Sequence, residues 1–130
     1  MPSIAIQRIY DNDTQGCAGK RILVDRLWPR GVTRERAAVE LWLKDVAPST
    51  ALRKAFHHGG ALTWTEFRRR YIHEIQVNPA PFELLMTETA AGPVVLLYSS
   101  RETEQNHAVI LRDLLRARLD ETSDCAECIW

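Results

Sequence analysis

The chain has 130 residues, a formal net charge of zero, 45% hydrophobic residues and 26% charged residues. This composition is that of an ordinary soluble globular protein with one core. The longest purely apolar run, residues 94–97, is too short to cross a membrane, and no signal peptide opens the chain. The three cysteines, an odd number, favour a reducing cytoplasm over a disulfide framework. We therefore expect one cytoplasmic domain over residues 1–119 and a polar tail over residues 120–130.

Two strands come first in the chain. Recurring isoleucines predict a strand over residues 3–10, and a β-branched apolar run predicts a second strand over residues 21–27, which Pro29 ends. The connection over residues 11–19 is rich in turn-forming residues and too short for a comfortable crossover helix. Since parallel neighbours need a long crossover, we expect the first two strands to pair antiparallel.

The rest of the chain is predicted to be mainly helical. Thr33 and Ser49 have the side chains of helix N-caps, and Thr63 with Glu66 fits a capping box, in which each side chain bonds the other residue's backbone. Residues 41–43 form a short apolar run that fits neither the periodicity of a helix nor that of a strand. The expected elements are, in order, helices over residues 33–39, 49–56 and 63–75, a helix between Pro81 and Gly92, a strand over residues 94–98 and a helix over residues 104–119.

These elements predict a single three-layer α/β domain, with a small, mostly parallel sheet flanked by helices. The runs 21–27 and 94–98 are apolar, so we expect both to be central strands of one sheet. Each of them ends in polar side chains. If the two strands are parallel neighbours, these side chains reach the same edge of the sheet, where open α/β folds bind their ligands.

Binding of a small anionic or nucleotide-like ligand is the most concrete interpretation of this edge. Arginine side chains hold negative charge, a tryptophan packs against a flat group, and an aspartate orients or deprotonates the ligand. The sequence does not decide between binding and turnover. The predicted ligand-binding residues are Arg26, Trp28, Arg30, Ser100, Arg101 and His107, and the predicted catalytic residues are Asp25, Lys44 and Asp45.

Each of these candidates also has a purely structural interpretation. Asp25 and Arg26 fit an ion pair that ties a loop to the sheet, and residues 44–45 fit a surface pair. Ser100 and His107 are a possible nucleophile and base, but no Gly-x-Ser-x-Gly motif exposes the serine. For every residue at this edge, the sequence is therefore compatible with a role in stabilising the fold as well as with a role in ligand binding or catalysis.

No metal or cofactor is expected. His57 and His58 are adjacent in the chain, so their side chains diverge and do not share a metal ion. Cys125 and Cys128 have the spacing of half a zinc site or of a redox pair, but they end the chain instead of opening a helix inside a βαβ unit. An adventitious thiol pair is the favoured interpretation.

Several motifs together resemble one bacterial family. The string VDRLWPRG at residues 24–31 resembles the signature of the family catalogued as domain of unknown function 488, in its short YeaO-like branch. The match runs in order from Ile4 to about Leu119 and leaves the tail outside. The other matching segments are Trp42–Ser49, Leu52–Lys54 with Phe56–His57, Trp64-x-x-Phe67-x-x-x-Tyr71, and Leu96–Tyr98 with Asn106–Ala108.

The resemblance implies a small cytoplasmic α/β domain, and the activity of the family is unassigned. Longer relatives look as though they carry a cysteine at the end of the strand that matches residues 94–98. In this chain the strand ends in Leu97-Tyr98-Ser99. The resemblance therefore implies no thiol nucleophile here.

Two other functions stay open. A nucleic-acid-associated or regulatory protein would use the basic helix around residues 68–70, because the first half of the chain carries an excess of lysine and arginine. The neutral net charge and the lack of a helix-turn-helix pattern make nucleic acid an unexpected partner. The second alternative is a non-catalytic protein-interaction module. The sequence does not predict the oligomeric state.

Overall fold

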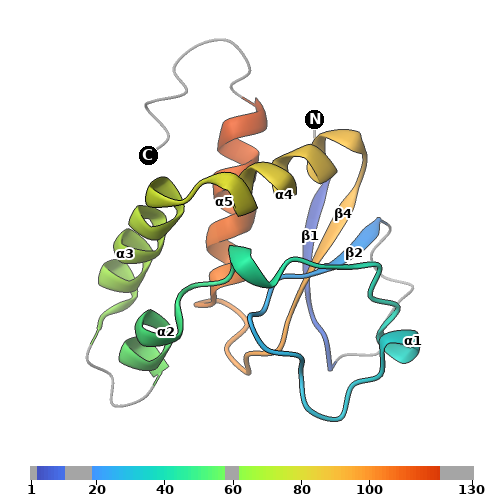
Figure 1. Cartoon of the computed structure of the whole chain (residues 1–130), viewed down its shortest axis with the longest axis horizontal. Coiled ribbons are helices and arrows are strands. Elements are labelled where there is room, and N and C mark those ends of the chain that lie inside the picture. Colours follow the sequence, from blue (N-terminus) through green and yellow to red (C-terminus); the bar gives the residue numbers. More distant parts are fainter. Residues whose placement is uncertain (1–2, 11–18, 58–61, 121–130) are drawn as a thin grey trace.

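The structure of the protein is a computed structural model that describes residues 3–10, 19–57 and 62–120. Within these residues one sheet is formed by β1 (Ile4–Arg8), β2 (Lys20–Leu23), β3 (Leu41–Trp42) and β4 (Val94–Tyr98), in the order β1-β4-β2-β3 (Figure 1). All paired strands are parallel. The predicted α/β fold is confirmed, and so is the prediction that β2 and β4 are interior neighbours.

The prediction that the first two strands pair antiparallel is wrong. β4 lies between β1 and β2 and is parallel to both, so that Leu96 pairs with Ile6 on one side and with Ile22 on the other. All five residues of β4 are buried, which places this strand at the centre of the sheet. An extended chain spans up to about 3.5 Å per residue, so the number of residues between β1 and β2 is sufficient to reach from one side of β4 to the other.

The helices largely follow the caps expected from the sequence. The Thr33 side chain caps the first helix, and Thr63 with Glu66 forms the predicted capping box. The last helix begins later than predicted, because the Asn106 side chain accepts the Val109 N–H at 3.1 Å and caps the helix there. The helical segments are α1 (Arg34–Ala37), the 3-10 turn η1 (Lys44–Val46), α2 (Thr50–His57), α3 (Trp64–Val77), α4 (Ala80–Ala91) and α5 (His107–Asp120).

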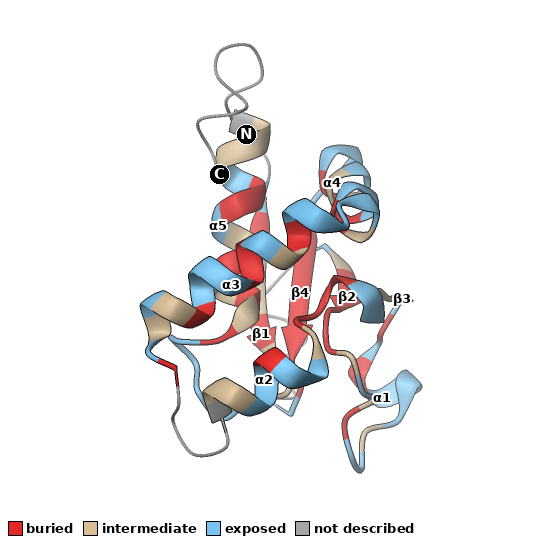
Figure 2. Cartoon of the chain, turned by 60° about the vertical axis from the view of Figure 1, so that its left-hand side comes forward, coloured by how far each residue is buried: buried red, intermediate tan, exposed pale blue. Residues whose placement is uncertain are grey.

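The two faces of the sheet have different covers. Figure 1 shows α3, α4 and α5 gathered to one side of the strands, with α1 apart from them. Val94, Leu96 and Tyr98 belong to the larger core on the side of these helices. Val95 and Leu97 belong to a smaller core that includes Ala37 of α1. Burial concentrates on the strands and on the helix sides that face them (Figure 2).

The carboxyl ends of β2 and β4 lie next to each other. Leu23 pairs with Leu97, and the Val24 N–H then donates to the Leu97 carbonyl at 3.1 Å. β2 itself ends at Leu23, earlier than the predicted Leu27. The residues that follow both strands are therefore brought to one edge of the sheet. None of the described helices is long and apolar enough to cross a membrane.

Candidate functional site

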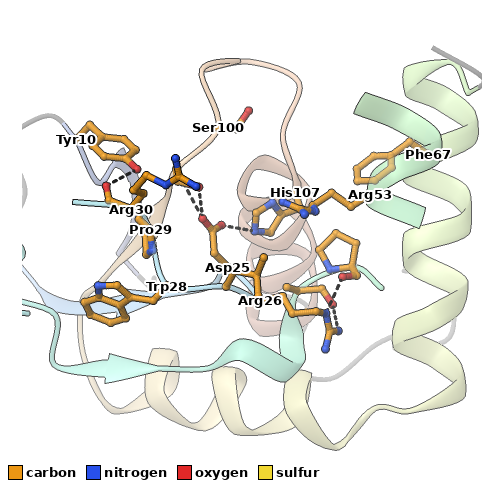
Figure 3. A pocket seen from close by; sticks show the side chains of 14 residues that line it. Tyr10, Asp25, Arg26, Trp28, Pro29, Arg30, Arg53, Phe67, Ser100 and His107 are labelled. Atoms are coloured by element: carbon orange, nitrogen blue, oxygen red, sulfur yellow. Dashed lines mark hydrogen bonds and ion pairs between the residues drawn. The ribbon is translucent and has the colours of Figure 1, made fainter. Parts of the chain in front are cut away.

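A pocket of about 320 Å³ lies at this carboxyl edge (Figure 3). Its floor comes from the ends of β2 and β4 and from the start of α5, and its rim comes from the loop after β2 and from α2. The lining residues are Tyr10, residues 25–30, Ala47, Pro48, Arg53, Phe67, Ser99, Ser100 and His107. The shared edge that the sequence predicts for the two strands is thus a concave site.

Asp25 is the centre of a hydrogen-bond network on the floor of the pocket. Its Oδ2 accepts the Ser99 N–H at 3.0 Å and also the Ser99 hydroxyl. Its Oδ1 lies 3.2 Å from His107 Nε2, and the two side chains are only 11% and 13% exposed. The three residues come from the ends of two adjacent strands and the start of α5, so the fold itself assembles the network.

The network keeps Asp25 ionised despite its burial. Burial alone raises the pKa of a carboxyl, but the hydrogen bond and charge of His107 and the two hydrogen bonds from Ser99 together hold the pKa of Asp25 below its ordinary value. At neutral pH the carboxylate is therefore ionised and accepts hydrogen bonds from Ser99 and His107. The catalytic role of Asp25 stays a prediction.

The ring of His107 has a defined orientation. Its Nε2 lies 2.9 Å from the Val24 carbonyl oxygen as well as beside Asp25. Both neighbours are acceptors, so Nε2 carries the hydrogen and Nδ1 is the basic nitrogen of the neutral ring. Tyr71 stands edge-on to the imidazole, with 6.3 Å between ring centroids. Burial raises the pKa of Tyr71 well above its ordinary value, so the phenol beside His107 is neutral.

The three arginines that line the pocket differ in their bonding. Arg26 donates to the carbonyls of Pro48 at 3.1 Å and Ala47 at 3.0 Å, which braces the loop after β2 against the segment before α2. Arg30 and Arg53 are exposed, and within the described part of the chain neither guanidinium has a hydrogen bond or ion pair. These two cations are available to a ligand, whereas Arg26 is a brace.

The two tryptophans at the edge also act as braces. Trp28 Nε1 donates to the Val32 carbonyl at 2.7 Å, and Trp42 Nε1 donates to the Asp25 carbonyl at 2.7 Å. Their rings meet edge-to-face, with centroids 5.3 Å apart. Trp28 also contributes to the pocket lining, and its packing against a ligand stays a prediction.

The remaining predicted residues divide between the pocket and the surface. Ser100 lines the pocket, and its hydroxyl accepts the Glu102 N–H at 3.1 Å. Arg101 is exposed and does not line it. Lys44 lies 5.7 Å from the centroid of the Trp42 ring, again outside the lining. Asp45 is likewise outside and is 72% exposed. The structure therefore does not bring these last three residues into the pocket with Asp25.

Eight residues of the pocket lining were not among the predicted site residues: Tyr10, Leu27, Pro29, Ala47, Pro48, Arg53, Phe67 and Ser99. Ser99 had a signal, since it is the first polar residue after β4. Arg53 lies in the Leu52–Lys54 segment of the family resemblance, but its position on a short helix does not indicate which strand end that helix approaches. Among the described residues, no group of histidine, cysteine, aspartate or glutamate could hold a metal ion. Cys125 and Cys128 lie outside the described residues.

Comparison with known proteins places the chain in a family. A family model described as the inactive DUF488-N3 subclade matches residues 3–128. The chain is 43% identical over 115 residues to the uncharacterized protein YeaO of Escherichia coli K12, covering 88% of this chain and 98% of that protein. It is 36% identical over 115 residues to the uncharacterized protein Rv3073c of Mycobacterium tuberculosis H37Rv, covering 88% and 95%. The chain belongs to the DUF488 family.

This result confirms the resemblance carried by the VDRLWPRG string. The matching family model continues past residue 119 to residue 128, so family membership alone does not separate a tail from the domain. The boundary at residue 119 stays a prediction. No solved structure gives a significant match to the chain.

Proposed function

We propose that the pocket at the carboxyl edge binds a small anionic or nucleotide-like ligand. By nucleotide-like we mean an anionic group that is joined to a larger body. We further propose that the pocket binds this ligand without converting it to a product. The observation that carries the proposal is the pair of arginines, Arg30 and Arg53, whose guanidinium groups have no partner among the described residues and border one pocket.

The charge balance of the lining supports an anion. Three arginines and one aspartate line the pocket, which gives a formal charge of +2 with His107 neutral. The single carboxylate accepts hydrogen bonds from Ser99 and His107 on the floor, and its charge leaves the lining with a positive excess. A guanidinium offers a carboxylate or phosphate two parallel hydrogen bonds, so two free guanidinium groups fit one such group or two. The pocket volume is at the low end of the range for small-molecule sites.

The polar groups of the floor favour binding over catalysis. The Ser99 hydroxyl donates to Asp25, and the Ser100 hydroxyl accepts a backbone N–H, so neither serine is paired with His107 as a nucleophile is with its base. Among the described residues no cysteine lines the pocket. The subclade whose model matches is described as inactive, which agrees with this view.

A thermal-shift screen of nucleotides, sugar phosphates and carboxylates, followed by calorimetry, tests the proposal. Arg30→Ala and Arg53→Ala should each weaken the best binder about tenfold or more, since a hydrogen bond to a charged group is worth about 1.5–3 kcal/mol. Arg30→Lys should recover little, because an ammonium does not reproduce the planar fork. Arg68→Ala removes an equally exposed arginine outside the pocket and is the matched control. A screen without a stabiliser, or equal losses in the control, would contradict the proposal.

A further inference from the structure

We infer that the ligand is amphipathic: its anionic group is joined to a flat apolar ring, as in an aromatic phosphate or carboxylate. This inference rests on the proposed function and narrows its ligand class. It comes from the mouth of the pocket, where apolar side chains stand beside the free arginines.

Exposed large apolar side chains are few in the described residues, and two of the four lie at this mouth. Tyr10 is 41% exposed and Leu27 is 64% exposed, and both line the pocket. The other two, Val77 and Leu84, lie on α3 and α4 and do not line it. Single exposed apolar residues are ordinary on protein surfaces, but apolar groups gathered around a concave charged site mark a place for an apolar part of a ligand.

The ring of Tyr10 is held in place before any ligand arrives. Its hydroxyl donates to the Arg30 carbonyl at 3.0 Å, and the Arg8 guanidinium lies 4.8 Å from the centroid of the ring. Arg8 in turn donates to the Ser100 carbonyl at 3.1 Å. The ring is thus tied to both loops that form the edge. A fixed aromatic surface loses little conformational freedom on binding and favours a flat partner at stacking distance.

The exposure of Leu27 is also set by its neighbours. Arg26 is bonded to the carbonyls of residues 47–48, and Trp28 is bonded to the Val32 carbonyl. The residues on both sides of Leu27 are therefore fastened, and the leucine between them is held at the rim without cover. A ring that lies against Leu27 would remove this apolar surface from water while its anionic group meets the arginines that line the same pocket.

The test compares ligands of equal charge with and without a ring. Calorimetry measures phenyl phosphate against glycerol phosphate, and benzoate against acetate, so that either type of anionic group is covered. We expect the member with the ring to bind at least tenfold more tightly in one of the pairs. Leu27→Ser should reduce this advantage several-fold and leave the ring-free anion unchanged. Leu84→Ser, which alters an equally apolar and exposed residue on α4, should change neither.

The outcomes separate the two proposals. If the compounds with and without a ring bind equally in both pairs, and Arg30→Ala still weakens this binding, the inference of an amphipathic ligand is wrong. The proposed anion site would be supported by the same result. A ring advantage that survives Leu27→Ser and a second variant, Tyr10→Ala, would also overturn the inference of an amphipathic ligand. If none of the four compounds binds and the wider screen finds no stabiliser, the proposed function fails and this inference fails with it.

Discussion

The floor and the rim of the same pocket handle their charges in opposite ways. On the floor, Asp25 is buried and bonded to Ser99 and His107. On the rim, Arg30 and Arg53 are exposed and have no partner within the residues that the structure describes. Both regions are rich in charged and polar groups, and in the sequence they look alike.

The difference teaches which charges serve the fold and which are available to a ligand. A buried carboxylate without partners would be costly, so the floor is satisfied internally and its groups are difficult to remove. An exposed guanidinium is hydrated, so the absence of a protein partner costs little stability. The arginines of the rim can therefore stay unpaired until a ligand binds. In the proposed function, the floor therefore organises the site and the arginines of the rim contact the ligand. Mutations should separate these two roles.

The largest effect is expected from Asp25→Ala. The substitution leaves the Ser99 N–H, the Ser99 hydroxyl and His107 Nε2 without the carboxylate that they contact. Each buried group that loses its hydrogen-bond partner costs about 1–3 kcal/mol, so we expect a total loss of about 3–5 kcal/mol. Urea unfolding should show this loss, whereas Arg30→Ala should stay within about 0.5 kcal/mol of the unaltered protein. Similar losses in the two variants would erase the distinction between floor and rim.

The second prediction concerns pH and uses Asp25→Asn as the reference. The pKa of Asp25 in the folded protein lies below its ordinary value, so the unfolded chain binds the proton first as the pH falls. The stabilisation from the carboxylate is therefore fully present above the ordinary pKa and is lost as the pH drops through the lower, folded value. The stability difference between the unaltered protein and Asp25→Asn should shrink over this acidic range.

Unfolding free energies measured in steps below pH 5 check this prediction. Comparing the two proteins at each pH removes the contribution of the other carboxyl groups. A difference that grows on acidification would mean that burial outweighs His107 and Ser99, and that the carboxyl is held protonated in the fold.

The fold was largely predictable because its signals are local. The buried run Val94–Tyr98 and the Thr63 capping box each specify an element without reference to the rest of the chain. Strand order carries no such local signal. The position of β4 between β1 and β2 follows from which strand is best buried on both faces, and the short connection over residues 11–19 favoured the wrong, antiparallel pairing.

The site was predictable only where it continues a strand. Asp25, Ser100 and His107 line the pocket because strand ends and the start of the next helix meet at one edge. Lys44 was grouped with them on chemistry alone, and the turn η1 carries it outside the pocket. Arg53 was missed for the opposite reason, since the packing of α2 on α3 decides where this arginine lies.

A moderate effect is expected from Ser49→Ala, which tests how the rim is held. The Ser49 hydroxyl accepts the Leu52 N–H at 3.1 Å and donates to Glu74 at 2.6 Å, so it caps α2 and ties it to α3. Removing such a cap costs about 0.5–2 kcal/mol. The same change should weaken the binding of the anion with the highest affinity, because α2 carries Arg53. Thr50→Ala, at the exposed neighbouring position, is the control and should leave both stability and binding nearly unchanged.

The smallest effect is expected from Asp45→Ala, although the sequence places Asp45 among the catalytic candidates. Its carboxylate lies 4.0 Å from Arg26 Nη1 and is 72% exposed. Arg26 keeps its two carbonyl partners without it, and an exposed ion pair contributes about 0–1 kcal/mol. We therefore expect an unfolding free energy within about 0.5 kcal/mol of the unaltered protein. We also expect unchanged affinity for the anion whose binding Arg30→Ala weakens. A tenfold change in that affinity would mean that Asp45 reaches the ligand. The site would then extend from the pocket along Arg26 to η1, and the catalytic interpretation of Asp45 would return.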